Sequence, residues 1–417
     1  MLWRRSRSGD ERVGQGDDEQ HSRPVKILQV DVDERSKKPT IQVSSGDRLW
    51  IEVVKDGHVV GVIDGRAEGD ALPASVIEKL ASDFNDVGIP TLVPLTDDAL
   101  PRASVVVPTL CREPLELVRL VKSLVALDYP DFDIIVVDNR VGRVVPSLPE
   151  LPSDPRVRVF RERTPGASAA RNRGIEMSTS DIIAFTDDDA IVTTDWLRVI
   201  GTRFALDPEI EGICGLVLPW ELESAPQVWF EEFYGGFSPS FRFEKLSMAR
   251  LKKVDKMFPY DVGRFGAGCN MAYRRSTIQR LGNFNVCLGG GTPSKGGEDI
   301  LVAVNLVAKG GTYAYEPAAV IRHRHRRTEA EFLNQAFDYG TGLTALYTAL
   351  IVKDPRHLFA LARRVPVGVA HLLRSPEARS VSSSPSYPRR TLIYQVAGMV
   401  YGPLAYVRSV IRNRLSA

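Results

Sequence analysis

The sequence predicts an α/β protein with a mostly parallel sheet that helices cover on both faces. Short runs rich in Val and Ile, such as ASVVVPT at 103–109 and DIIVVDN at 133–139, alternate with apolar-periodic helical segments. Strands of a parallel sheet read as continuous apolar runs because both of their faces are buried. Polar residues follow these runs at the strand ends, where open α/β sheets bind ligands.

The elements of this region follow one another as strands and helices. A helix is expected at 115–127, after Pro114, and a strand at 157–162. A second helix at about 168–177 then leads into the strand DIIAFTDDDA at 181–190. The glycine-rich loop 289–299, GGGTPSKGGED, precedes a further apolar helix.

The chain of 417 residues, 43% of them hydrophobic and 25% charged, is long enough for two or three domains. We predict a disordered segment at 1–23, followed by a small β-rich module at 24–100 that ends with a helix at 73–84 and its following loop. The main α/β domain is predicted at 101–345 and divides into a nucleotide half (101–190) and an acceptor half (191–345). A basic helical tail follows at 346–417 and contains a Ser/Pro-rich linker at 375–388.

Charge is unevenly distributed along the chain. The formal net charge is +2, but residues 350–417 carry +9, which leaves the remainder near −7. Such a tail suggests an anionic surface, either lipid or nucleic acid. The uncharged run 391–407 has arginines on both sides and is short for a membrane span, so an interfacial helix at a membrane is favoured over a docking helix or a span, and no nucleic-acid partner is predicted.

The four cysteines lie far apart and show neither metal-binding nor disulfide-framework spacing. The N-terminus has no apolar run of the kind a secretory signal needs. We therefore expect a cytoplasmic location, peripheral at the inner face of the plasma membrane.

Three consecutive carboxylates, Asp187, Asp188 and Asp189, end the strand at 181–190. If the backbone stays extended, Asp187 and Asp189 point to one face and Asp188 to the other. Two hard oxygen ligands on one face suit Mg²⁺ or Mn²⁺, which fill their other positions with water and substrate phosphates. A solvated acidic turn is the alternative.

Two other groups of residues fit a nucleotide site. Asp138 follows the strand 133–137 and could accept hydrogen bonds from a base or ribose, or cap a helix. The segment PGASAARNRG at 165–174 combines a helix start with Arg171 and Arg173, which suits an anion.

The motifs VVVPTLCREP, IIVVDN, PGASAARNRG, AFTDDDA, FGAGCNMAYRR and GGED, in this order between Ser104 and Gly342, resemble glycosyltransferase family 2, inverting enzymes with a GT-A fold. The likeness is to non-processive bacterial members, because the QxxRW motif of processive synthases is absent after Gln335. Cys111 stands where the family commonly has Asn.

The resemblance implies a metal-dependent transfer of a sugar from a UDP-, GDP- or dTDP-linked donor to a hydroxyl acceptor, such as a cell-envelope glycan or a lipid-linked one. It assigns Asp187 and Asp189 to the DxD metal motif and Asp299 to the catalytic base, with Glu298 orienting the acceptor. The residues it implies for nucleotide binding are Pro108, Thr109, Arg112, Glu113, Asp138, Arg171 and Asp187, and we include Asp188 with them.

Three later segments leave alternatives open. In VIRHRHRRT, His323 is a metal or phosphate ligand, His325 is a weaker candidate, and a basic surface strand is the alternative. The aromatic segment 229–243 fits either an acceptor site or core packing. A helix at 332–351 is expected to be interrupted at 340–342.

Two other functions compete with the glycosyltransferase. A nucleotidyltransferase shares parallel sheets and metal-binding acids, but it would usually have a glycine-rich basic loop after the first strand, where this chain has PTLCREP. A non-catalytic sugar-nucleotide sensor or membrane scaffold would not need both the metal acids and a candidate base.

Overall fold

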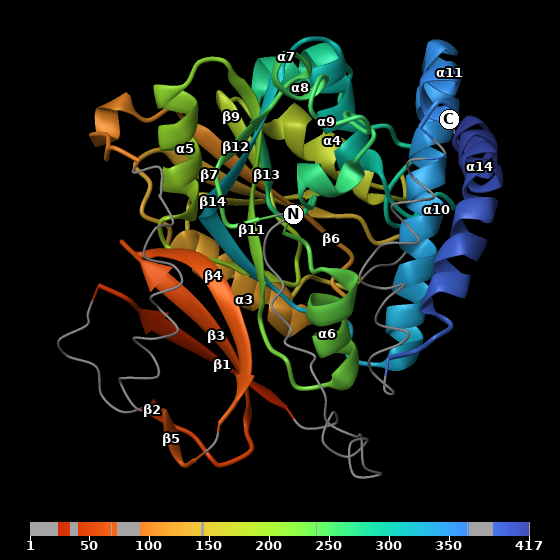
Figure 1. Cartoon of the computed structure of the whole chain (residues 1–417). Coiled ribbons are helices and arrows are strands. Elements are labelled where there is room, and N and C mark those ends of the chain that lie inside the picture. The colour runs from red at the N-terminus through yellow and green to blue at the C-terminus, as the bar shows by residue number, and fades with distance from the viewer. Residues whose placement is uncertain are drawn as a thin grey trace.

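In the computed structural model of the protein, the described residues are 24–33, 41–67, 69–72, 92–142, 146–238, 240–364, 366 and 387–416. The disorder expected at 1–23, the helix expected at 73–84 and nearly all of the linker expected at 375–388 lie outside these ranges. Figure 1 shows a central sheet with helices packed around it, a smaller sheet beside it and a pair of long helices at the opposite edge.

The central sheet of the described chain has nine strands in the order β10-β14-β11-β13-β9-β6-β7-β8, with β12 paired to β14. Its strands are β6 (Ala103–Thr109), β7 (Phe132–Asp138), β8 (Val157–Arg161), β9 (Ile182–Phe185), β10 (Ala190–Val192), β11 (Ile210–Pro219), β12 (Glu244–Leu246), β13 (Met271–Arg274) and β14 (Thr312–His323). Neighbours from β9 to β8 pair in parallel, as do β11 and β14, whereas β13, β10 and β12 pair antiparallel. The predicted α/β class is confirmed, and the sheet is parallel chiefly in its nucleotide half.

Helices cover both faces of this sheet, as predicted. The turn η1 (Asp97–Ala99) precedes the main domain, whose described helices and single turns are α3 (Pro114–Val125), α4 (Ala167–Met177), α5 (Trp196–Leu206), α6 (Ala225–Trp229), η2 (Phe230–Tyr234), α7 (Met248–Leu251), η3 (Val262–Phe265), α8 (Arg275–Leu281) and α9 (Glu298–Ala308). Apolar residues of α3 and α5 form one buried core, and those of α4, α8 and α9 form the other. On the second face α4 packs closely on β6, because a Cβ added to Gly174 would lie 2.3 Å from Val106.

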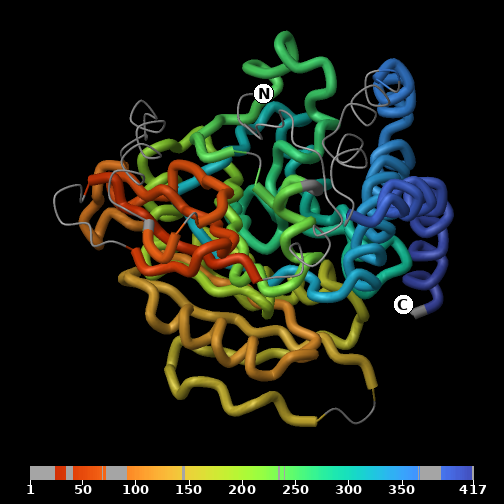
Figure 2. Tube along the Cα trace, turned by 60° about the horizontal axis from the view of Figure 1, so that its bottom comes forward, coloured from red at the N-terminus to blue at the C-terminus, as the bar shows by residue number. Residues whose placement is uncertain are grey.

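The N-terminal module is a separate three-stranded sheet of β1 (Val25–Asp31), β3 (Arg48–Lys55) and β4 (His58–Arg66), accompanied by the short pair β2 (Ile41–Gln42) and β5 (Ala71–Leu72). Figure 2 shows it against the body of the protein, on the side away from the C-terminal helices. Its fully buried Glu52 receives hydrogen bonds from Arg322 of β14. The N-terminal module therefore contacts and supports β14, the strand that ends at His323.

The described residues of the C-terminal region include the helices α10 (Glu329–Lys353), α11 (Arg356–Ala362) and α14 (Thr391–Ser416). A capping box between Thr328 and Glu331 starts α10. The interruption expected at 340–342 is wrong: α10 is continuous, and its glycines allow close approach, Gly340 to the backbone of α14 and Gly342 to that of Gly296. Within the described ranges, no helix combines the length and apolar composition needed to cross a bilayer.

Candidate active site

The three acids lie in a turn between β9 and β10. The prediction that Asp187 and Asp189 point to one face and Asp188 to the other assumed an extended backbone, and it is therefore wrong. The amide of Ala190 donates to the carbonyl of Asp187 across this turn. Each carboxylate has a different partner: Asp187 contacts Arg171, Asp188 contacts Thr109, and Asp189 contacts His323. The turn thus distributes the acids among three neighbouring elements.

Arg171 joins two of the sequence motifs. Its Nη2 lies 3.0 Å from Asp187 Oδ1, and its Nη1 lies 2.6 Å from Glu298 Oε1. The guanidinium is buried on α4; burial alone lowers its pKa, but Asp187, Glu298 and Asp299 raise it on balance, so the charge is retained. The turn after β9 and the start of α9 are therefore held on opposite sides of one cation.

His323 stands at the end of β14 and faces the acids. Its Nε2 lies 3.0 Å from Asp189 Oδ1. Burial lowers the pKa of His323, but the charge and hydrogen bond of Asp189 raise it by more, so the net pKa is raised. Conversely, burial raises the pKa of Asp189, but His323 and Arg326 bring it down to about 2. Asp189 is consequently ionised throughout the neutral range.

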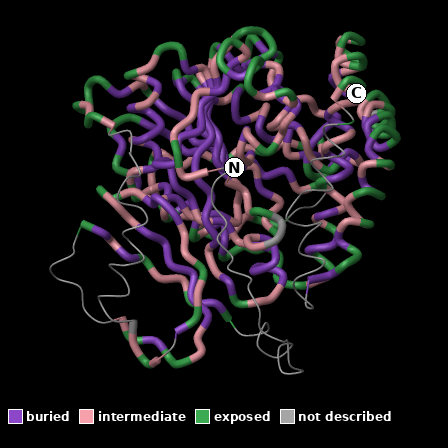
Figure 3. The backbone as a smooth tube through the Cα atoms, in the orientation of Figure 1, coloured by how far each residue is buried: buried purple, intermediate pink, exposed green. Residues whose placement is uncertain are grey.

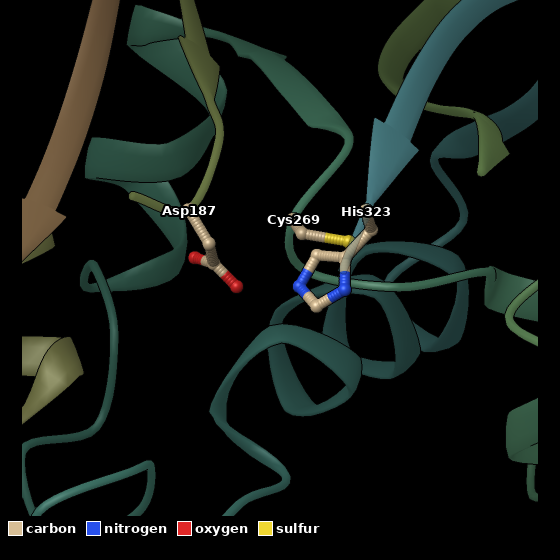
Figure 4. Close-up of side chains that lie close together, drawn as sticks. All are labelled: Asp187, Cys269 and His323. Atoms are coloured by element: carbon tan, nitrogen blue, oxygen red, sulfur yellow. The ribbon is translucent and has the colours of Figure 1, made fainter. Parts of the chain in front are cut away.

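Figure 4 shows Asp187, Cys269 and His323 converging from three segments. Each offers one ligand atom, and these atoms lie within 4.8 Å of one another. His323 Nδ1 is buried without a hydrogen-bond partner among the described residues. An unsatisfied imidazole nitrogen beside a carboxylate and a thiol fits a divalent metal. Cys269 was not identified as a ligand from the sequence, although the motif FGAGCNMAYRR that contains it was recognised.

Residues predicted to bind a nucleotide lie at the ends of β6 and β7. Thr109 donates its hydroxyl to Asp188 and accepts from the amide of Cys111 at 2.8 Å. Burial, followed by the neighbouring charge of Asp189, raises the pKa of Asp188 to about 6. Pro108 is half-buried in β6, and Arg112 and Glu113 are exposed just before α3.

Asp138 lies at the end of β7 and is engaged by Arg140. Two guanidinium nitrogens of Arg140 donate to its carboxylate at 2.8 Å, and these hydrogen bonds lower the pKa of Asp138. Both residues border an open pocket of about 430 Å³ whose other lining residues are Pro146, Ser147, Leu148, Pro149, Leu151, Val159, Phe160 and Arg161. Sequence reasoning did not identify Arg140, which lies only two residues after the predicted aspartate.

Glu298 and Asp299 form the first turn of α9, where the helix dipole favours carboxylates. Burial raises the pKa of each, and the proximity of Asp299 adds to the rise at Glu298. Asp299 also lies beside the backbone of Gly268, where an added Cβ would be 2.6 Å from its Oδ2. The pair therefore lies next to both Arg171 and the segment that carries Cys269.

The second histidine and the aromatic segment form part of the packed interior. His325 Nε2 lies 2.6 Å from Glu231 Oε1, and its ring packs against Phe230 and Phe237. Phe237 also meets the ring of His323 edge-on. These contacts favour core packing as the role of 229–243. They also show that His325 is engaged by Glu231 and the aromatic rings rather than by the three acids.

The acids, His323 and the buried Arg171 lie together at one edge of a mixed α/β sheet, where folds of this class bind ligands. Residues 104–282 match the family model "Glycosyl transferase family 2". These residues therefore form a glycosyltransferase family 2 domain, and the predicted enzyme class, a glycosyltransferase, is confirmed at the level of this domain.

Curated proteins of similar sequence include a glycosyltransferase and a polysaccharide biosynthesis protein. The chain is 26% identical over 225 residues to the "Pre-mycofactocin glycosyltransferase" of Mycobacterium tuberculosis, covering 53% of this chain and 43% of that protein. It is 28% identical over 215 residues to the "Succinoglycan biosynthesis protein ExoM" of Rhizobium meliloti, covering 49% and 61%. The chain thus spans about half the length of these relatives.

Among solved structures, the mannosyltransferase PcManGT from Pyrobaculum calidifontis, in complex with GDP-Man and Mn²⁺, superposes with a TM-score of 0.48 at 16% identity. The match covers 78% of this chain and 92% of that one.

Proposed function

We propose that the protein transfers a sugar from a nucleotide-diphosphate sugar to a hydroxyl acceptor by a single, inverting displacement. The observation that carries the proposal is the bridge made by Arg171, which holds Asp187 and Glu298 on either side of one buried cation. The bridge brings the acids expected at the donor next to the acids expected at the acceptor. A transferase needs its two substrates in contact, with the reacting atoms aligned.

The donor would bind along the rim from β7 to β9. The pocket beside Asp138 offers apolar walls from Leu148 and Phe160 and polar groups from Arg140 and Arg161, which suits a base and ribose. Pro108, Thr109, Arg112 and Glu113 extend this rim toward the acids.

The residues that would hold a divalent metal are Asp187, Asp189 and His323, with Cys269 beside them. A bound Mg²⁺ or Mn²⁺ would neutralise charge on the donor diphosphate. The mixture of carboxylate, imidazole and thiol donors suits Mn²⁺ better than Mg²⁺, which prefers oxygen ligands.

Asp299 is the base in this proposal. Its carboxylate takes the proton of the acceptor hydroxyl as that oxygen bonds to the anomeric carbon, and the bond from the anomeric carbon to the diphosphate oxygen breaks. The nucleoside diphosphate leaves with the bonding electrons. Burial raises the pKa of Asp299, which makes its carboxylate a stronger base at neutral pH. Glu298 is held by Arg171 and orients the acceptor.

A donor screen tests the proposal. The purified protein is incubated with UDP-, GDP- and dTDP-linked sugars and hydroxyl acceptors, with and without Mg²⁺ or Mn²⁺, and release of nucleoside diphosphate is measured. We expect release that depends on both acceptor and metal and that yields a glycosidic linkage of inverted configuration. Release of pyrophosphate instead would indicate a nucleotidyltransferase, and a product of retained configuration would exclude single displacement.

The acceptor and the location stay predictions. We infer a cell-envelope glycan or a lipid-linked sugar as the acceptor and a peripheral position at the inner face of the plasma membrane. The basic C-terminal tail supports both inferences.

A further inference from the structure

The helix α14 has two faces of opposite character. Its inner face is made of small residues that fit closely against α10: a Cβ added to Gly398 would lie 2.1 Å from the carbonyl oxygen of Phe337, and one added to Gly402 would lie 2.0 Å from Thr344 Oγ1. This face is fully used by the helix pair, which Figures 1 and 2 show side by side.

The outer face carries large apolar side chains that remain exposed. Exposure ranges from 41% at Val396 to 85% at Leu415, and Figure 3 shows exposed residues along this helix. We call these residues the outer stripe: Ile393, Val396, Val400, Leu404, Val407, Ile411 and Leu415. Successive members are three or four residues apart, so they align along one side of a helix. A continuous apolar stripe of this kind marks an interaction surface.

Arginines border the outer stripe on both sides. At 100° per residue, Arg414 falls on one margin and Arg408 and Arg412 fall on the other, and all three are exposed. Arg389 and Arg390 directly precede the helix, and the stretch from Arg389 to the end of α14 contains no acidic residue. An apolar stripe bordered by cations fits an anionic lipid surface, with apolar side chains in the acyl boundary and the guanidinium groups of Arg408 and Arg414 at the headgroups.

A second copy of this chain fits the stripe less well. Parallel pairing would place Arg408 against Arg408, and antiparallel pairing would place the C-terminal arginines against Arg389 and Arg390, with no carboxylate on either helix to compensate. From Ile393 to Leu415 the stripe covers 22 residues in six steps. The mean spacing between its members is therefore longer than the 3.5 residues of a left-handed coiled coil. A nearly straight stripe suits a flat surface.

We propose that the outer stripe of α14 docks the protein on an anionic membrane, and that docking brings the loop 289–297 to the bilayer surface. The loop is attached to α14 directly: Ser294 Oγ and Ser409 Oγ are 3.0 Å apart, and Arg412 Nη2 donates to the carbonyl of Gly291 at 3.1 Å. Because this loop leads into Glu298 and Asp299, a lipid-linked acceptor lying in the same membrane would meet the site. This second clause rests on the proposed function, whereas docking itself does not.

Vesicle flotation of the full chain tests docking. We expect the wild-type protein to float with phosphatidylcholine vesicles that contain phosphatidylglycerol, and to float at least tenfold less with phosphatidylcholine alone. The double variant Val400→Ser, Leu404→Ser should lose at least tenfold in partitioning, since each buried apolar side chain contributes strongly. In the variant Arg408→Glu, Arg414→Glu, partitioning onto the vesicles should fall at least fivefold for each arginine replaced, and the loss should depend on the salt concentration.

The matched control replaces exposed residues of the same types elsewhere, Val254→Ser and Leu206→Ser, and should float like the wild type. Thermal melting shows whether each variant is folded. Equal flotation of the stripe variant and the control, or no flotation of the wild type, would overturn the proposal. If light scattering shows a dimer of the wild type but a monomer of the stripe variant, the outer stripe binds a second copy of the chain. If the stripe is protected from hydrogen exchange in the absence of vesicles, another segment of this chain covers it.

Transfer to a soluble hydroxyl acceptor, measured without vesicles, separates the two proposals. The stripe variant should keep wild-type activity in this assay while losing flotation. If no donor is used by any variant but flotation follows the pattern above, the proposed function fails and docking stands.

Discussion

The two halves of the main domain supply their site residues in different ways. In the nucleotide half, Thr109 and Asp138 each end a strand of the parallel sheet, and Asp187 follows the next such strand by two residues. In the acceptor half, Cys269 precedes an antiparallel strand, Asp299 lies in the first turn of a helix that follows a long loop, and His323 ends β14.

The acceptor half also depends on contacts from outside the domain core. Glu52 of the N-terminal module holds Arg322 next to His323, and Ser409 of α14 holds the loop that leads to Asp299. In the nucleotide half, the contacts of Thr109 with Asp188 and of Arg140 with Asp138 are made within that half. Changes far from the site should therefore affect acceptor use more than donor binding.

Replacing the proposed base should have the largest effect. Asp299→Asn keeps the size of the side chain and removes its ability to take a proton, so we expect the turnover number to fall about 10²- to 10⁴-fold. Donor binding, measured by calorimetric titration with nucleoside diphosphate and Mn²⁺, should change little.

The matched change is Glu298→Gln on the neighbouring position. Because Glu298 is bonded to Arg171, its replacement should raise KM for the acceptor more than it lowers the turnover number. A greater loss of turnover in Glu298→Gln than in Asp299→Asn would exchange the roles of the two acids.

The proposed metal ligands lie where the two halves meet, so their loss should affect both. Asp189→Ala removes the carboxylate beside His323, and we expect Mn²⁺ affinity in the presence of nucleotide to fall about 10- to 100-fold or more. Electron paramagnetic resonance of Mn²⁺ measures this without relying on activity. Cys269→Ser serves as the milder comparison, because a hydroxyl replaces the thiol and should weaken Mn²⁺ less than Asp189→Ala does. Unchanged Mn²⁺ binding in Asp189→Ala would place the metal elsewhere.

The difference between the halves also explains what the sequence could predict. Strand ends in a parallel sheet follow from apolar runs, so the convergence of Thr109, Asp138 and the acids could be inferred from pattern alone. The separate partners of Asp187, Asp188 and Asp189 could not, because they depend on a turn whose neighbours lie far apart in the chain. The proximity of Cys269 to His323 likewise depends on the pairing of β13 and β14 with β11, which no local pattern specifies.

Long-range packing also decided the C-terminal region. Glycines in a helical sequence predicted an interruption at 340–342, since glycine is a poor helix former. The structure uses Gly340 and Gly398 for close approach of two continuous helices instead. Whether a glycine breaks a helix or admits a neighbour depends on a partner about sixty residues away in the sequence, which local propensity does not describe.

The helix pair offers a test of the acceptor half from a distance. In Gly398→Val the added side chain would collide with the backbone of α10, and we expect unfolding free energy to fall by about 1 to 3 kcal/mol. Because α14 holds the loop 289–297, KM for the acceptor should rise while donor affinity stays near the wild-type value. Ala397→Val, on the exposed side of the same helix, is the control and should alter neither quantity. An equal loss of donor affinity in Gly398→Val would show that the two halves do not differ in their supports.

The smallest expected effect lies in the nucleotide half, at Asp188. The folded state raises its pKa from 3.8 to about 6, chiefly through burial, so its ionised form is disfavoured by folding. Well below pH 3.8 the group is protonated in both states and has no effect on stability. As pH rises toward 6 the unfolded chain ionises first, stability is lost, and the full penalty remains at higher pH.

Asp188→Asn cannot ionise and can still accept the hydroxyl of Thr109. The variant should therefore match the wild type well below pH 3.8 and exceed it by about 1 to 2 kcal/mol above pH 6, after allowance for partial solvent screening. Chemical denaturation across this pH range, with a chelator present so that no metal favours the ionised form, measures the difference. Asp154→Asn is the control, because the pKa of Asp154 is lowered to about 2 by hydrogen bonds from Arg156, and its loss should reduce stability at neutral pH. A stability difference for Asp188→Asn that does not grow between pH 3.8 and 6 would mean that this carboxylate is solvated, and that the nucleotide rim is more open than its contacts with Thr109 indicate.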